Sequence, residues 1–168
     1  ARMTLRMENY IKEVLRLIHA SWPGLLTAMD VVNESVNENG TFRTASNEWY
    51  TTFGDATYVM KAFEFTRQYA LLYGEAQIKL YYNDYNLYKP EKRAGVLRLV
   101  KSIQDKGIPV HGIGMQGHYG LTHPADLTQI EDSILAFSGL GDVMITELDM
   151  TVLPSPDKAD EGADISMD

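Results

Sequence analysis

The sequence predicts an α/β fold with a parallel sheet, and three observations carry this prediction. Short, near-continuous apolar runs alternate with helical patterns in the order α-β-α-β-α-β-α-β, which is typical of βα units. The last three runs begin at residues 77, 110 and 143, so two successive units are each 33 residues long. Every run also ends in polar side chains, at the strand ends where folds of this class place their sites.

The four apolar runs are the predicted strands, and they resemble parallel strands that are covered on both faces. They span Leu25–Val32, Gln77–Asn83, Val110–Gln116 and Val143–Asp149. Four βα units are too few to close a barrel, which needs about eight. The chain alone is therefore either a small open sheet or part of a barrel.

Helices are predicted before and between these strands. Pro90 opens the third helix, with Glu91 in its first turn, and Gly107 closes it. Apolar stripes at helical spacing mark the first, second and fourth helices: Ile11, Val14, Leu15 and Ile18, then Val59, Met60, Phe63 and Ala70, then Leu127, Ile130, Ile134 and Leu135.

Two segments lie outside this regular pattern. An extra loop, Ser35–Gly54, follows the first strand and carries the aromatic residues Trp49, Tyr50 and Phe53. The tail, Pro154–Asp168, is rich in Pro and Asp and has no periodicity, so it is predicted to be loop or disordered.

Composition excludes several classes of protein and site. The 168 residues are 45% hydrophobic, enough for a sizeable core, and carry a net charge of −8, which argues against nucleic acid as a partner. The absence of cysteine excludes disulfides and Cys-ligated zinc. No apolar run is long enough to span a bilayer, and the first ten residues lack the features of a signal peptide.

The predicted strand ends bring carboxylates and amides to one edge of the sheet. They read Asp30-Val31-Val32-Asn33-Glu34, Asn83-Asp84-Tyr85-Asn86, Gln116-Gly117-His118 and Glu147-Leu148-Asp149. Glycosidic cleavage needs two carboxylates: one protonates the leaving oxygen, and the other attacks the anomeric carbon or activates water. Aromatic platforms for sugar rings are available in Trp49, Tyr81, Tyr82, Tyr85, Tyr88 and Tyr119, although strand alternation assigns Tyr81 or Tyr82 to packing.

Other chemistries find little support in the sequence. His118 and His123 do not form a His-Glu-x-x-His metal motif. Gly112-Ile113-Gly114 lies inside a predicted strand rather than in a phosphate-binding loop, and no serine stands at a sharp elbow. We therefore predict no metal and no cofactor.

The strand ends together resemble the successive signatures of glycoside hydrolase family 10, most of whose members are endo-β-1,4-xylanases on a TIM (β/α)8 barrel. The segments that carry the resemblance are residues 30–34, 83–86, 112–118 and 145–149. It implies that residues 1–153 are a partial catalytic domain covering roughly barrel strands 4 to 7. Strands 1–3 and 8 would then come from another segment of the same protein. Xylan or xylo-oligosaccharide would be the substrate, and the protein would be secreted, at the cell surface or periplasmic.

The same resemblance implies a role for each matching residue. Glu34 would be the general acid/base and Glu147 the nucleophile of a reaction that retains configuration. Asn33 would bind the 2-hydroxyl of the sugar under attack, while His118 would hydrogen-bond Glu147 and Asp149 would orient His118. The predicted substrate-binding residues are Gln116, Tyr85, Asn83 and Trp49.

Two positions depart from the usual family pattern, and two other functions stay open. Met29 and His111 stand where the family usually has Trp and Asp, and we interpret both as changes in packing. Another two-carboxylate glycosidase, such as a cellulase or mannanase, is one alternative. The second is a non-catalytic carbohydrate-binding protein on a degenerate barrel, which would be expected to have lost one of the two glutamates.

Overall fold

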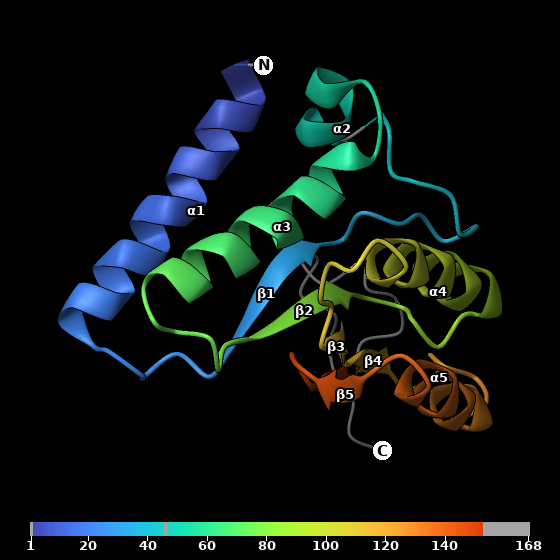
Figure 1. Cartoon of the computed structure of the whole chain (residues 1–168). Coiled ribbons are helices and arrows are strands. Elements are labelled where there is room, and N and C mark those ends of the chain that lie inside the picture. The colour runs from blue at the N-terminus through green and yellow to red at the C-terminus, as the bar shows by residue number, and fades with distance from the viewer. Residues whose placement is uncertain (1, 46, 153–168) are drawn as a thin grey trace.

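The structure is a computed structural model that describes residues 2–45 and 47–152, so the predicted tail 154–168 lies outside the described residues. Helices and strands alternate along the chain, as predicted (Figure 1). The elements are α1 (Arg2–Ser21), β1 (Ala28–Asn33), α2 (Glu48–Phe53), α3 (Thr57–Leu72), β2 (Lys79–Asp84), α4 (Pro90–Gln104), β3 (Gly112–Met115), β4 (His118–Gly120), α5 (Thr128–Ser138), β5 (Asp142–Ile145) and β6 (Asp149–Thr151).

The main sheet has four strands in the order β1-β2-β3-β5, and every pairing is parallel. This confirms the predicted α/β class and the parallel sheet. The first strand begins three residues later than predicted, after a turn at Gly24, whose φ of 76° favours glycine. The last predicted strand is interrupted, because β5 ends at Ile145 and residues 146–148 leave the ladder before β6.

Helices cover the sheet along its length. In Figure 1, α1 and α3 run side by side next to β1, whereas α4 and α5 lie toward β3 and β5. Side chains from α3, the strands and α4 fill the core between them, and Phe63, Leu80, Tyr82, Ile113 and Val100 are fully buried. Tyr81 is buried as well as Tyr82, since its ring packs against Gly112 and its hydroxyl donates to Asp142.

Two short features were not predicted. The long loop after β1 contains α2, which Asn47 caps by accepting from the Tyr50 backbone N–H and which Gly54 ends at a φ of 83°. β4 and β6 pair in parallel, with His118 opposite Asp149. Three-residue strands carry too little periodicity to stand out in a sequence.

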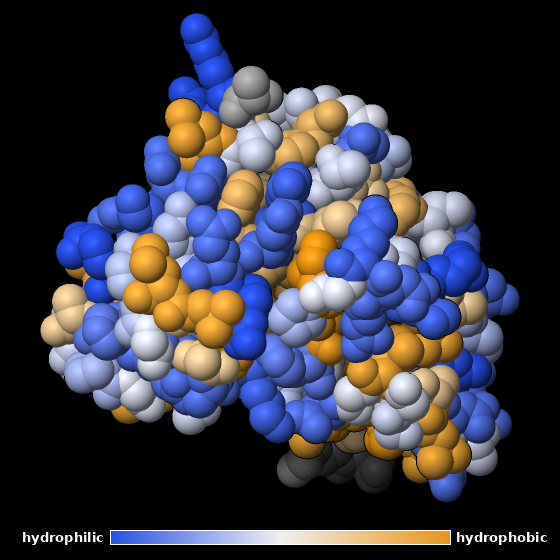
Figure 2. Space-filling model, in the orientation of Figure 1, coloured by the Kyte–Doolittle hydropathy of each residue, from blue (hydrophilic) through white to orange (hydrophobic). Residues whose placement is uncertain are grey.

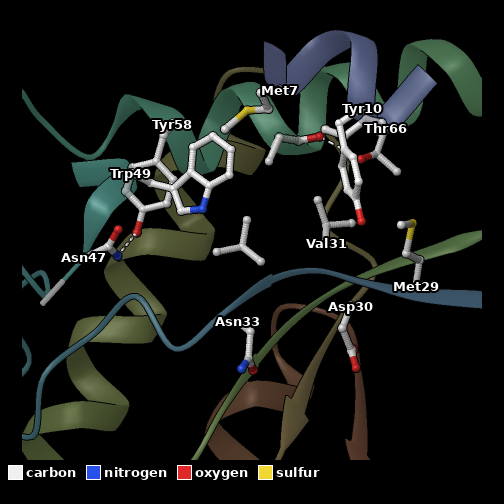
Figure 3. A pocket seen from close by; sticks show the side chains of 13 residues that line it. Met7, Tyr10, Met29, Asp30, Val31, Asn33, Asn47, Trp49, Tyr58 and Thr66 are labelled. Carbon is white, nitrogen blue, oxygen red and sulfur yellow. Dashed lines mark hydrogen bonds between the residues drawn. The ribbon is translucent and has the colours of Figure 1, made fainter. Parts of the chain in front are cut away.

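Both edges of the main sheet are open in the part of the chain that the structure describes. β1 pairs only with β2, and β5 pairs only with β3. Apolar side chains lie exposed beside β5, among them Leu135, Met144 and Ile145, and orange residues gather at the lower right of Figure 2 over α5 and β5. Beside β1, a pocket of about 410 Å³ opens between α1, α2 and α3 (Figure 3).

Candidate active site

Glu34 and Glu147 stand at the carboxyl ends of the two edge strands. Glu34 follows β1 and adopts a left-handed backbone with a φ of 54°, which is uncommon for a residue other than glycine. Its backbone N–H donates to the Asn83 carbonyl across a 2.9 Å bond, which holds this conformation in place. Strained backbone of this kind concentrates at functional sites. Glu147 follows β5, in the short interruption before β6.

A continuous chain of hydrogen bonds joins the two glutamates. Gln116 Nε2 donates to Glu34 Oε1 (3.2 Å) and to Asn33 Oδ1 (2.9 Å). Asn83 Nδ2 donates to the same Asn33 oxygen (3.0 Å) and to Glu147 Oε1 (2.7 Å). Gln116 and Asn83 are 4% and 2% exposed, so protein contacts rather than solvent fix both amides.

The orientation of the Asn83 amide is set from its far side. Its Oδ1 accepts a hydrogen bond of 2.7 Å from Thr146 Oγ1. Gly114 lies directly against the same oxygen: a Cβ added there would come within 2.4 Å of Asn83 Oδ1 and 2.8 Å of Thr146 Cγ2. Glycine at position 114 therefore leaves the space in which Asn83 turns its N–H groups toward Asn33 and Glu147.

His118 links Glu147 to Asp149. Its Nε2 lies 3.1 Å from Glu147 Oε2, and its Nδ1 lies 2.8 Å from Asp149 Oδ2. The hydrogen bond to Asp149, followed by the one to Glu147, raises the pKa of His118 above 6.5. Each carboxylate oxygen of Glu147 therefore has one hydrogen-bond partner: Asn83 contacts Oε1 and His118 contacts Oε2.

Arg43 approaches Glu34 from the opposite side to Gln116. Its Nη1 lies 3.4 Å from Glu34 Oε2, and its Nη2 donates to the Tyr85 hydroxyl at 2.9 Å. Tyr85 is thus linked to Glu34 by two hydrogen bonds through Arg43. Arg43 was not among the predicted site residues, because it lies in a loop without periodicity, nine residues beyond Glu34.

Asp30 is a second residue near the site that was not among the predicted site residues. It lies on β1, and partial desolvation of its carboxyl group, followed by the nearby charge of Glu147, raises its pKa above 3.8. The signal was present in the sequence, since Asp30 is the first residue of the polar run at the end of the predicted strand.

Trp49 lines a pocket that adjoins the hydrogen-bond chain between the two glutamates, because Asn33 belongs to both. It projects from α2 into the pocket beside β1, near Tyr58 and Asn47, while Asn33 and Asp30 line the other side (Figure 3). Trp49 is 41% exposed, so its ring is available to a ligand in that pocket.

Among residues 2–45 and 47–152, no three His, Asp or Glu side chains converge in a way that could hold a metal ion. None of the helices in the described part of the chain combines the length and the apolar character needed to cross a membrane. The site offers two carboxylates, amide donors and a histidine, which is the equipment of acid–base and nucleophilic catalysis.

Comparison with known proteins identifies the family. The sequence matches glycosyl hydrolase family 10 over residues 1–165. It is 35% identical, over 157 residues, to a putative endo-1,4-beta-xylanase from Caldicellulosiruptor saccharolyticus, and the match covers 90% of this chain and 48% of that relative. It is 37% identical to an endo-1,4-beta-xylanase from Geobacillus stearothermophilus, covering 90% of this chain and 43% of the relative.

Solved structures agree with this match. Xylanase B from Clostridium stercorarium superposes with a TM-score of 0.81 at 38% identity, covering 96% of this chain and 45% of that one. An intracellular xylanase from Thermoanaerobacterium saccharolyticum gives a TM-score of 0.79 at 29% identity, covering 89% of this chain and 44% of the other. The chain therefore spans less than half the length of these relatives, and its fold corresponds to part of their TIM barrel.

Proposed function

The chain belongs to glycosyl hydrolase family 10, and from this premise we propose that the protein containing it is an endo-β-1,4-xylanase that cleaves internal bonds of xylan with retention of configuration. The observation that carries the proposal is the hydrogen-bond chain from Glu34 to Glu147. It links two carboxylates from two strand ends through buried amides, and a double-displacement reaction requires a pair of carboxyl groups. Relatives named as xylanases supply the substrate class.

In this proposal Glu147 is the nucleophile. Donors on both of its oxygens, Asn83 and His118, stabilise the ionised carboxylate and fix its direction. The attacking oxygen forms a covalent bond to the anomeric carbon while the glycosidic oxygen departs. Water then cleaves the resulting ester, so two inversions give net retention.

Glu34 is the general acid and then the general base. Its contacts, 3.2 Å to Gln116 and 3.4 Å to Arg43, are longer than those that hold Glu147. Such contacts leave the carboxyl group able to give its proton to the leaving oxygen and later to take one from water. Retention needs the two carboxyl groups about 5–5.5 Å apart, and we expect that spacing in the complete barrel.

The remaining predicted residues surround this pair. Asn33 uses its side-chain oxygen within the hydrogen-bond chain, and among the described residues its amide nitrogen has no partner, which supports a role in binding the 2-hydroxyl. Gln116 and Asn83 hold the carboxylates from within the protein. Tyr85 on the acid side and Trp49 in the neighbouring pocket supply surfaces for sugar rings.

The same protein must also supply the rest of the barrel. The open edges at β1 and β5 would pair with strands 3 and 8, and the pocket in Figure 3 lies along the first of these edges. Unpaired edges and exposed apolar surface favour aggregation. An active monomer with a measured mass of only 18.9 kDa would contradict this part of the proposal.

Export from the cytoplasm is also a proposal, since polymeric xylan lies outside cells. One relative of known structure is named as an intracellular xylanase, so family membership alone does not decide the compartment. Cell fractionation followed by a xylanase assay on each fraction tests this point directly.

The deciding experiment measures the release of reducing sugar from xylan by the complete protein. We expect the Glu147→Ala and Glu34→Ala variants to lose most of this activity. The matched control is Glu64→Ala, because Glu64 makes only an exposed ion pair with Lys61. Near-full activity in Glu147→Ala would show that the nucleophile is assigned wrongly, and a cellulose-specific activity would replace xylan as the substrate.

A further inference from the structure

Arg43 is the one cation in contact with Glu34 among the described residues, and the reaction outlined above assigns it no role. The two side chains are 21% and 33% exposed, so solvent screens their attraction only in part. The loop that carries Arg43 is folded back on the strand end, because the Arg43 backbone N–H donates to the Ser35 carbonyl at 2.9 Å. Arg43 is therefore held close to Glu34 by its backbone as well as by its side chain.

The Tyr85 hydroxyl fixes the outer end of Arg43. Nη2 of Arg43 donates to this hydroxyl at 2.9 Å, and the guanidinium carbon lies 5.5 Å from the centre of the Tyr85 ring. A guanidinium donates in a planar fork, so a firm bond on one nitrogen restricts where the other points. With Nη2 on Tyr85, Nη1 faces Glu34 Oε2.

A buried ion pair between Lys92 and Asp84 packs against the ring of Tyr85. The Lys92 ammonium has no exposed surface and lies 3.4 Å from the centre of the Tyr85 ring. It pairs with Asp84 at 2.8 Å, and Asp84 also accepts from the Tyr82 hydroxyl (2.6 Å) and the Tyr85 backbone N–H (2.9 Å). Burial lowers the pKa of Lys92 and raises that of Asp84, while their mutual attraction opposes both changes.

A buried ion pair of this kind usually adds little to stability, since desolvation of both charges offsets their attraction. The better-supported role of such an ion pair is to hold the neighbouring side chains in one conformation. Here the pair lies directly under Tyr85, next to the site, and its contacts determine where the ring and hydroxyl stand.

We propose that Arg43, held by the Tyr85 hydroxyl above the Lys92–Asp84 pair, is a positioning residue that aims Glu34 at the leaving oxygen. This inference rests on the proposed function, because it assumes that Glu34 transfers the proton. Arg43 fixes one carboxyl oxygen and stabilises the anion that remains after the proton has left. Its contribution to kcat/KM, which reports formation of the glycosyl-enzyme, is therefore confined to substrates whose leaving group needs that proton.

The test compares two aryl β-xylobiosides with the complete protein. A phenyl leaving group needs a proton from Glu34, whereas a 2,4-dinitrophenyl group leaves without one. For Arg43→Ala and for Tyr85→Phe we expect kcat/KM on the phenyl substrate to fall by about 10- to 100-fold, the range for a hydrogen bond to a charged group. On the dinitrophenyl substrate, kcat/KM of Arg43→Ala should change by less than about threefold, and Arg43→Lys should recover part of the loss on the phenyl substrate.

Arg98→Ala is the matched control, because Arg98 holds the same loop by donating to the Gly40 carbonyl but does not contact Glu34. It should leave the ratio of the two kcat/KM values at that of the wild type. An equal loss on both substrates in Arg43→Ala, or no loss on either, would overturn the inference while leaving the proposed function intact. A wild-type protein that hydrolysed neither xylan nor the xylobiosides would instead remove the proposed function itself.

Discussion

The side-chain nitrogen of Asn83 lies 2.7 Å from Glu147 Oε1 and donates a hydrogen bond to it. The other hydrogen of the same amide goes to Asn33 Oδ1, and the amide oxygen accepts from Thr146. Both N–H groups are in use and only 2% of the surface of Asn83 is exposed. We therefore expect Asn83, which was predicted to bind substrate, to act on a bound sugar through its neighbours rather than by direct contact.

Replacement of Asn83 should therefore lower kcat rather than raise KM. In Asn83→Ala, Glu147 loses one of its two donors, and we expect kcat on xylan to fall by about 10- to 100-fold. Asn83→Asp should be worse near neutral pH, because a second carboxylate would then face Glu147. Steady-state kinetics of the complete protein measures both effects.

Thr146→Val is the graded control for this prediction. It removes the hydroxyl that donates to Asn83 Oδ1 and keeps the shape of the side chain. We expect a loss of a few-fold only, since the hydrogen bonds from Asn83 itself remain. A rise in KM with kcat unchanged for Asn83→Ala would show that this residue binds substrate directly.

Gly114→Ala should disturb the same amide by steric pressure. The new methyl group would stand 2.4 Å from Asn83 Oδ1, so the side chain has to turn or the strands have to separate. Overpacking of this kind costs about 1–3 kcal/mol of stability, and the kcat should fall with it.

Gly139→Ala provides the comparison, because an added Cβ there meets only the Ala136 carbonyl oxygen at 3.5 Å. Thermal unfolding should separate the two variants clearly. Equal unfolding temperatures would contradict the close packing of Gly114 against Asn83.

His118 and His111 should titrate on opposite sides of the ordinary histidine value. Hydrogen bonds to Asp149 and Glu147 raise the pKa of His118, while burial and then the charge of Arg67 lower that of His111. Protonated His118 therefore contributes stability that is fully present below pH 6.5 and is lost as the pH rises through its raised pKa. Histidine NMR titration of the complete protein checks the order.

Asp149→Asn removes the first cause of this shift. The His118 pKa should then move down toward 6.5, and His111 should titrate as before. An unchanged His118 titration in Asp149→Asn would show that Asp149 does not control this histidine.

Much of the fold could be predicted because its signals are local. The four strands of the main sheet correspond to the apolar runs, and Pro90 begins a helix that ends at Gln104, three residues before the predicted end at Gly107. The break at residues 146–148 could not be predicted, since Ile145 to Asp149 reads as one strand until His118 pairs with Asp149 on a separate ladder. Helix α2 is six residues long, too short to show a period.

The candidate site likewise contains residues that the sequence could indicate and residues that it could not. Glu34 and Glu147 stand at strand ends, where a carboxylate is conspicuous in an apolar context. The position of Arg43 depends on how its loop folds back, and that of Lys92 depends on its burial beside Asp84. Neither can be inferred from the spacing of residues in the sequence. A cation in the long loop after the first strand was the one available hint.

An external nucleophile such as azide should distinguish the role of Glu34 from that of Glu147. In Glu34→Ala the glycosyl-enzyme forms from a dinitrophenyl substrate but lacks a base to activate water. Azide needs no base, so it should restore turnover and give a β-glycosyl azide. An α-azide would contradict retention.

Trapping of the covalent intermediate tests the central claim most directly. The complete protein is incubated with the 2,4-dinitrophenyl glycoside of 2-deoxy-2-fluoroxylobiose, whose fluorine slows release of the glycosyl-enzyme more than its formation. Peptide mass spectrometry should then find one fluoroglycosyl group attached to the carboxyl of Glu147. Attachment at any other residue, or no attachment by a protein that still hydrolyses xylan, would contradict the assignment of Glu147 as nucleophile and Glu34 as acid/base.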